Sequence, residues 1–205
     1  MSTSAAQANP AILLPGAAFG GGFYAGRILV NGQPFGLIVA PKAEGEHADA
    51  VWNKSTKLVE GAQSFFDGRA NTEAMAKAGS KLAQWALDLR IGGCDDWYLP
   101  SRDELEILYR NLKPTIDDNW VHRHGDNPSS VPPGYPYTAR APLQTEAEAF
   151  QDGQPEAFDA VWHWSSTQLA SISVSAWFQT FDVGNQNGYR KDFHYRARAV
   201  RRLPI

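Results

Sequence analysis

Few residues of this chain could form a catalytic set. Cys94, the single cysteine, has no cysteine-enzyme motif around it, so we interpret it as a small buried packing group. The segment Ser165 to Thr167 lacks the G-x-S-x-G turn of hydrolases. Asp95 and Asp96 are adjacent, and one of them is expected to cap a turn rather than to form an acid–base pair. No catalytic residue is predicted, and an oxidase or hydrolase whose catalytic set assembles from distant residues is the least favoured function.

Metal and nucleotide sites are not predicted either. His122 and His124 are two positions apart, a spacing that meets one ion only from an extended strand, and we interpret residues 122–124 as a solvated loop. Residues 154–156 have the form of a lectin calcium tripeptide, but no acidic cluster accompanies them. The glycine-rich segment 16–26 matches no phosphate-binding pattern. The chain is therefore expected to need no cofactor.

The charge balance argues against a general nucleic-acid binder and leaves room for local basic patches. The formal net charge is -3 and the pI is about 5.9, which provides no global attraction for a polyanion. A basic stretch near the C-terminal end could bind phosphate, or it could pair with the acidic segment 144–159, and we favour the pairing. This stretch comprises Arg190, Lys191, Arg196, Arg198, Arg201 and Arg202.

One domain is expected to position these residues. With 205 residues, 43% hydrophobic and 12% aromatic, the chain can bury one sizeable core and is too rich in packing groups to be disordered. Residues 1–22 are predicted to be an N-terminal arm that docks onto a partner, and residues 23–205 to be the domain. The first basic residue is Arg27 and no apolar run reaches membrane-helix length, so neither a signal peptide nor a membrane helix is expected.

A β-hairpin is predicted at the start of the domain. Phe23–Val30 and Gln33–Val39 are rich in apolar and β-branched residues, and Asn31-Gly32 between them suits a tight turn. Pro34 lacks an N–H, so the second strand is expected either to lie at a sheet edge or to begin pairing one residue later.

A long helix is predicted in the middle of the chain. Apolar residues recur there at intervals of three and four positions over Asn71–Leu89. Asn71 or Thr72 is the expected cap, and the Gly92-Gly93 pair is the expected terminator.

A second helix is predicted to follow a short extended segment. Ser101 and Glu104 have the spacing of a capping box, and the helix must stop before Pro114. Its buried face is expected to carry Leu105, Leu108, Tyr109 and Leu112.

The last third reads as an irregular insertion followed by strands. The insertion, at about 125–160, is rich in proline and is expected to hold a helical turn at Thr145–Phe150. Alternating patterns predict strands over Trp162–Thr167, Ser175–Asp182 and Tyr195–Leu203, with a turn or loop at Gly184–Gly188. The predicted fold class is therefore α+β, with strands at both ends and two helices between them.

Three segments of the second half share a pattern in order as well as in type. Gly92 to Leu105 resembles the signature G-x-x-D-W-R-L-P-[ST]-x-x-E-L, with Tyr98 where arginine often stands. Trp162 to Thr167 resembles a Y-W-[ST]-S-T strand, with Trp177 at the following A-W position, and Arg196 to Arg202 resembles a closing V-R-x-V-R strand. From about Gly92 to Leu203 the chain thus resembles the Lcl C-terminal-like domains, a bacterial and phage family related to formylglycine-generating enzymes and C-type lectins. The upstream part resembles prophage members encoded near tail genes.

The resemblance implies a C-type-lectin-like fold with two helices packed on a small antiparallel sheet. Trp97, Leu99, Trp164 and Trp177 are then expected in the core. The formylglycine-generating enzymes use a cysteine pair near their C-terminal end, and no cysteine follows Cys94 here. Their oxidase chemistry is therefore not implied.

The resemblance also implies a place for ligand binding. Phage tail proteins of this fold, and the targets of diversity-generating retroelements, display variable residues just before the closing strand, which corresponds to residues 173–194 here. This zone is dense in residue types that stack and hydrogen-bond at little entropic cost, although residues 184–188 could also be a merely polar hairpin loop. The candidate ligand-binding residues are Phe178, Thr180, Asp182, Asn185, Asn187, Tyr189, Asp192 and His194.

The predicted function is a non-enzymatic module that binds a ligand or receptor, associated with a phage or prophage tail and contacting a host-surface protein or glycan. The arm would attach it to other tail proteins or to its own copies, and neither nucleic acid nor membrane insertion is expected. The protein would reside in the virion, or in the bacterial cytoplasm before assembly. The alternative is a structural or assembly component of a tail or baseplate with no ligand of its own.

Overall fold

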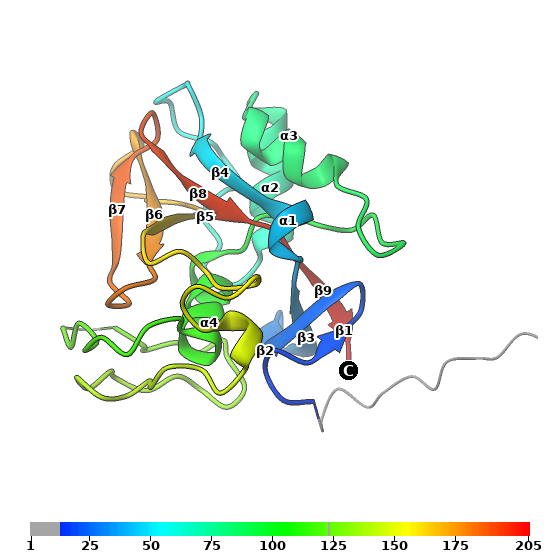
Figure 1. Ribbon diagram of the computed structural model, residues 1–205. Helices are drawn as coiled ribbons and strands as arrows, with labels where there is room; N and C mark the ends of the chain where they lie inside the picture. Colours follow the sequence, from blue (N-terminus) through cyan, green and yellow to red (C-terminus); the bar gives the residue numbers. More distant parts are fainter. Residues whose placement is uncertain (1–12, 123) are drawn as a thin grey trace, which may run out of the picture.

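The computed structural model of the chain describes residues 13–122 and 124–205, and these form two sheets with four helices (Figure 1). The four-stranded sheet has the order β1 (Ala18–Phe19), β2 (Gly22–Val30), β3 (Gln33–Val39) and β9 (Val200–Pro204). The five-stranded sheet has the order β4 (Glu46–Val51), β8 (His194–Arg198), β5 (Trp162–Gln168), β6 (Ser175–Thr180) and β7 (Gln186–Arg190). The helices are α1 (Lys42–Gly45), α2 (Gly68–Lys77), α3 (Lys81–Asp88) and α4 (Arg102–Leu112). The α+β class is confirmed, with two sheets where one small sheet was expected.

The predicted hairpin is present as β2 and β3. Asn31 has φ 51° and Gly32 has φ 80°, the left-handed pair that a tight hairpin turn requires. Of the two alternatives for Pro34, the edge strand is wrong, because β3 lies between β2 and β9, and the later start of pairing is confirmed on the β9 side. Pro34 is tolerated there since pairing with β9 begins only at Phe35, so no ladder bond is lost.

The predicted closing strand over Tyr195–Leu203 divides at Ala199 into β8 and β9, which belong to different sheets (Figure 1). The Ala199 N–H donates to the Gly45 carbonyl (2.8 Å), and the Ala40 N–H donates to the Ala199 carbonyl (3.0 Å). The end of the chain therefore joins the two sheets. The predicted loop at Gly184–Gly188 is also shorter, because its second half belongs to β7.

The long helix predicted over Asn71–Leu89 is two helices, α2 and α3. Gly79 adopts φ 85° after α2, and the Ser80 hydroxyl accepts the Ala83 N–H (3.3 Å) to cap α3. The cap of α2 is Asp67, upstream of the expected Asn71 or Thr72. The apolar spacing continues across the break between the two helices, because both bury apolar residues against the five-stranded sheet, and it therefore predicts a single helix.

The second predicted helix is confirmed as α4. Ser101 and Glu104 form the expected capping box, and the helix ends at Leu112, before Pro114. The four predicted apolar residues of its buried face are at most 1% exposed: Leu105, Leu108, Tyr109 and Leu112.

The proline-rich insertion wraps past α4 and is tied to the closing segment. Its expected helical turn is the 3₁₀ turn η2 (Glu148–Phe150). The predicted pairing of its acidic residues with the basic stretch is confirmed by ion pairs between Arg198 and Glu156 and between Arg196 and Asp159 (2.7 Å). These pairs hold an otherwise irregular segment against the domain.

The expected core tryptophans divide into two groups. Trp97 and Trp164 are 0% exposed, as is Leu99, which confirms them as core residues. Trp177 was expected in the core but is only partly buried, and it lines a surface cavity. Its ring lies against the Phe65 ring (centres 6.0 Å apart) and the Arg102 guanidinium, outside the buried clusters.

The described part of the predicted arm lies against the domain. β1 pairs with β2, and Leu13 and Phe19 pack on the cluster around Trp97. Residues 1–12 lie outside the described residues, so attachment through the arm stays a prediction. No helix in the described ranges is long and apolar enough to cross a membrane.

Candidate functional site

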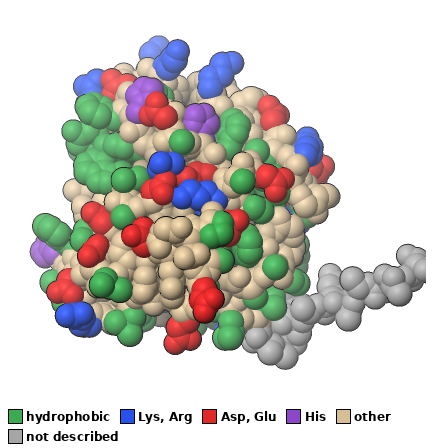
Figure 2. Space-filling model, viewed as in Figure 1, with side chains coloured by type: hydrophobic (Ala, Val, Ile, Leu, Met, Phe, Trp, Pro, Cys, Tyr) green, Lys and Arg blue, Asp and Glu red, His purple; other side chains and the backbone are tan. Residues whose placement is uncertain are grey.

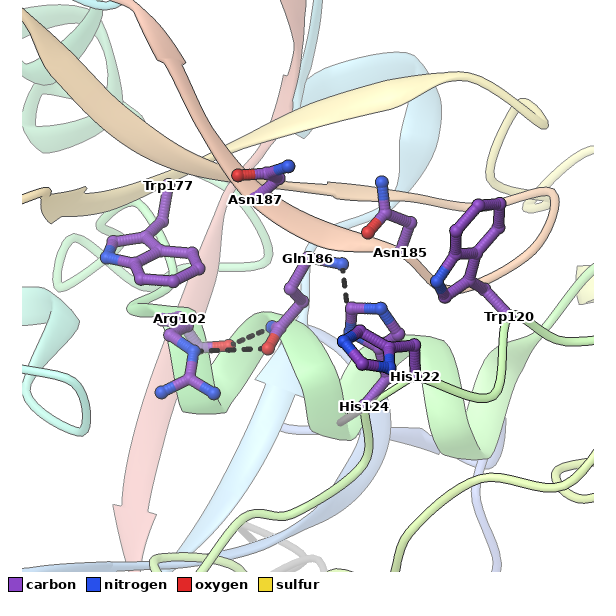
Figure 3. A pocket seen from close by; sticks show the side chains of 8 residues that line it. All are labelled: Arg102, Trp120, His122, His124, Trp177, Asn185, Gln186 and Asn187. Carbon is purple, nitrogen blue, oxygen red and sulfur yellow. Dashed lines mark hydrogen bonds between the residues drawn. The ribbon is translucent and has the colours of Figure 1, made fainter.

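A cavity of about 500 Å³ lies between the start of α4, the loop that follows α4, and the β6–β7 hairpin. Figure 3 shows Trp177 and Arg102 toward one end, Trp120 at the other, and Gln186 with the two histidines between them. The lining residues are Arg102, Trp120, His122, His124, Trp177, Asn185, Gln186 and Asn187.

The β6–β7 hairpin presents one wall of the cavity. β7 is the edge strand of its sheet, and its pairing places Trp177 opposite Gly188 and Gln179 opposite Gln186. The connection passes through Gly184, which has φ 73°, and a Cβ there would lie 2.3 Å from the Tyr109 ring of α4. A glycine is therefore required for the hairpin to pack this closely on α4.

The loop after α4 forms the opposite wall. The backbone N–H of Trp120 donates to the Val183 carbonyl (2.7 Å), which fixes the loop to the β6–β7 connection. The Asn119 amide donates to the Pro142 carbonyl (2.8 Å), and its oxygen accepts from Lys113 (2.9 Å). These bonds hold the backbone, while the Trp120 side chain is 54% exposed and available for contact.

Arg102 is held in place by Gln186. Its Nε donates to Gln186 Oε1 (3.1 Å), and Gln186 Nε2 donates back to the Arg102 carbonyl (3.0 Å) and to Gln179 Oε1 (2.7 Å). The guanidinium carbon lies 4.7 Å from the centre of the Phe65 ring and 5.0 Å from that of Trp177. The side chain is 20% exposed, so a fixed cation reaches the cavity.

His124 joins the two walls. Its Nδ1 accepts the backbone N–H of Gln186 (3.5 Å), and the residue is largely buried. Burial lowers the pKa of His124, and the neighbouring His122 and Arg102 lower it further. A neutral imidazole at pH 7 agrees with its acceptor role, since a protonated ring has no lone pair to offer.

The model of the Lcl C-terminal domain matches residues 45–201, which include every residue that lines the cavity. The chain belongs to the Lcl C-terminal domain family. No curated protein and no solved structure matches it.

Trp177, at the A-W position, lines the cavity, but other signature residues of this Lcl C-terminal domain are part of its internal framework. The Ser166 N–H donates to the Pro100 carbonyl (2.7 Å), which ties the W-S-S-T strand to the L-P turn. Asp96 pairs with Arg201 (2.6 Å), and not with a turn backbone as one of the two aspartates was expected to do. Both contacts join segments far apart in the sequence and lie outside the cavity lining.

Two of the eight predicted site residues, Asn185 and Asn187, line the cavity. Phe178 and Thr180 are each 3% exposed, so a ligand cannot reach their side chains without a rearrangement. Asp182 is half-buried and accepts the N–H of Val183 (2.7 Å).

The other three predicted residues lie away from the cavity. Tyr189 packs on Trp162 (ring centres 5.6 Å apart). Asp192 pairs with Arg190 (2.5 Å), and His194 pairs with Asp49 (3.1 Å). Residues 173–194 therefore contribute to two different surfaces, of which the cavity is the first.

The second surface is an aromatic patch made of Trp162, Tyr189, Phe193 and Tyr195. Trp162 stacks on the buried Phe178 ring, with centres 4.4 Å apart and planes 3° apart. Three of the four are 36–44% exposed: Trp162, Tyr189 and Phe193. Figure 2 shows hydrophobic side chains gathered over the β6–β7 side of the molecule.

Sequence reasoning missed most of the cavity. Interpreting residues 122–124 as a solvated loop was wrong for His124, which is 9% exposed. No sequence pattern indicates that Arg102 belongs to a site. The available signal was composition: Trp120, His122 and His124 cluster within five residues of a loop. Nothing in that spacing indicates β7 as the partner, because the contact spans about sixty residues of chain.

The cavity has no obvious metal chemistry. In residues 13–122 and 124–205, no three His, Cys, Asp or Glu side chains are grouped so that they could hold an ion. Cys94 lies elsewhere and is half-buried, not buried as expected, with its Sγ 3.7 Å from the Gly20 and Gly92 carbonyls. What the arrangement offers is stacking, amide hydrogen bonding and one fixed cation.

Proposed function

We propose that this Lcl C-terminal domain is a non-enzymatic ligand-binding module and that the cavity lined by Trp120, Trp177 and Arg102 is its site. The observation that carries the proposal is the convergence of two indoles, a guanidinium and two asparagine amides from three separate segments. Concave sites with aromatic walls and a few placed polar groups are typical of small-ligand recognition.

The site is organised before a ligand arrives. Gln186, His124 and the Trp120 backbone are all held by hydrogen bonds, whereas the Trp120 ring and the Asn187 side chain are exposed. Fixing the backbone in advance lowers the entropy that binding must overcome. Aromatic rings and short amides add contact area with few rotatable bonds.

The biological setting we propose is a phage or prophage tail, with the ligand on the host surface. The chain resembles tail-associated members of its family, and we propose that its two sheets and helices are a C-type-lectin-like arrangement whose exposed hairpin corresponds to the variable zone of retroelement targets. In this setting the protein is a virion component used in host attachment.

The test is binding of the purified protein to intact bacterial cells and to an envelope extract. Changing Trp120, Asn185 and Asn187 together to Ala should weaken binding at least about tenfold without lowering the melting temperature, because Trp120 and Asn187 are exposed and Asn185 is only half-buried. The matched control changes Tyr189 and Phe193 of the aromatic patch to Ala. Unchanged binding by the cavity variant, or loss of binding only in the control variant, would refute the assignment of the cavity as the binding site.

The alternative function is a structural tail or baseplate component, and the aromatic patch is the feature that favours it. Exposed aromatic side chains grouped on one sheet often mark protein contacts. Cross-linking within assembled particles separates the two functions. If cross-links show the cavity covered by another particle protein, the structural function is supported. If they show the aromatic patch covered and the cavity open to solvent, the protein is a binding module anchored through the patch.

A further inference from the structure

Arg102 carries a guanidinium that the protein fixes without neutralising. Its Nε is bonded to Gln186, but its two terminal nitrogens have no hydrogen-bond partner in the described part of the chain. Asp103 is the only carboxylate there within 4.0 Å, and it lies at that limit. The Asp103 carboxylate accepts the Ser129 hydroxyl at 2.8 Å, a much shorter contact than its 4.0 Å approach to Arg102.

Arginines that serve the fold are paired more closely. Arg201 meets Asp96 with two bonds of 2.6 and 3.0 Å, and Arg202 meets Asp67 at 2.9 Å. An arginine with a free fork of N–H donors is suited to bind two oxygens of one anionic group.

The rest of the cavity adds no negative charge. None of its eight lining side chains, all in the described ranges, is acidic, and the titratable ones besides Arg102 are His122 and His124. We propose that the ligand presents an anionic group, a carboxylate, phosphate or sulfate, to the terminal nitrogens of Arg102. The Asn185 and Asn187 amides and the Trp120 ring contact the remainder of that ligand. This inference rests on the proposed binding function.

The test uses sodium acetate, phosphate and sulfate as probes, against chloride at equal ionic strength and pH 7. Titrations followed by ¹H–¹⁵N spectra should show saturable shifts of the Gln186 and Asn187 amide signals with at least one oxyanion. The variant Arg102→Gln should weaken that binding at least about tenfold, and Arg102→Lys should give an intermediate loss because it keeps the charge without the fork. The matched control is Arg69→Gln, which removes the same charge from a side chain of α2 that is 38% exposed. Comparing planar acetate with the tetrahedral ions shows which group the site prefers.

A variant at a second position tests the proposal even if the Arg102 variants misfold. Asn187 is exposed, so Asn187→Asp should keep the melting temperature while placing a negative charge at the cavity. It should weaken oxyanion binding several-fold, whereas Asn187→Ala should not.

The outcomes separate the two proposals. Absence of saturable shifts with all three oxyanions, or equal shifts in Arg102→Gln, overturns the anion assignment. If cell binding still depends on Trp120, Asn185 and Asn187 in that case, the binding function stands without it. Conversely, Arg102-dependent oxyanion binding by a protein that binds no cells refutes only the host-surface function.

Discussion

The first turn of α4 carries two polar networks that differ in how completely they are satisfied. Glu104 faces inward, where its carboxylate accepts the N–H groups of Ser101 (2.7 Å) and Gly68 (3.2 Å) and the hydroxyl of Tyr98 (2.7 Å). Arg102, two residues earlier, faces the cavity, and its terminal nitrogens have no hydrogen-bond partner among residues 13–122 and 124–205.

The difference distinguishes residues that serve the fold from residues that serve recognition. A buried charge must be surrounded by donors or acceptors, because each missing partner is costly away from water. A cation at the edge of a cavity keeps water as its partner and can exchange that water for a ligand. The family signature around Glu104 is therefore a framework, and the site is built from residues beside it.

The largest expected effect concerns the buried tryptophans. Changing Trp164 or Trp97 to Ala should lower the free energy of unfolding by about 3–5 kcal/mol, because both side chains are fully buried. Chemical denaturation monitored by circular dichroism measures this. Native-like unfolding midpoints would refute their core role.

The second effect tests the hydrogen bonds that the Glu104 carboxylate accepts. Glu104→Gln keeps the shape but sets an NH₂ group among donors, so we expect a loss of about 2–3 kcal/mol in the same assay. Glu60→Gln, at an exposed position, is the matched control. Equal stability of the two variants would mean that the carboxylate network is not stabilising.

The third effect concerns the arm. Deleting residues 1–20 removes β1 and the Gly20 carbonyl that accepts from Arg201 (2.7 Å), and should cost about 1–3 kcal/mol of stability. Deleting only residues 1–12 should remove oligomerisation or particle incorporation while leaving the melting temperature nearly unchanged. Normal assembly of the shorter deletion would place the attachment elsewhere.

The fourth effect is a pH dependence from His163. Burial lowers the pKa of this fully buried imidazole to about 3, so between that value and about 6.5 the unfolded chain binds the extra proton. Its contribution to stability should therefore fall on acidification across this window, by up to about 1.4 kcal/mol per pH unit. His163→Phe, which retains the ring packing on Phe181, should flatten the slope measured by denaturation at each pH. Identical slopes would exclude His163 as the cause.

The smallest expected stability effect belongs to the cavity. Trp120→Ala should change the free energy of unfolding by less than about 0.5 kcal/mol, because the ring is more than half exposed. A large loss of stability would mean that Trp120 holds the loop, and the contrast between framework and site would then fail at this position.

Local signals determined several elements of this protein. The left-handed turn at Asn31-Gly32 and the capping box of Ser101 and Glu104 depend on residues within a few positions of one another. Their geometry follows from backbone sterics and short-range hydrogen bonds, which the sequence contains completely. Asn185 and Asn187 were also found from the sequence, through the family resemblance and the residue types in their zone.

Only the tertiary structure decided the rest. Whether residues 194–204 form one strand or two depends on Gly45 and Ala40, about 150 positions away, which hydrogen-bond to Ala199 at the junction. The cavity likewise depends on Gln186 orienting Arg102, and on Val183 holding Trp120. Such contacts are selected by the packing of whole elements against each other, because a hydrogen bond to a distant partner leaves no periodicity or spacing in the local sequence.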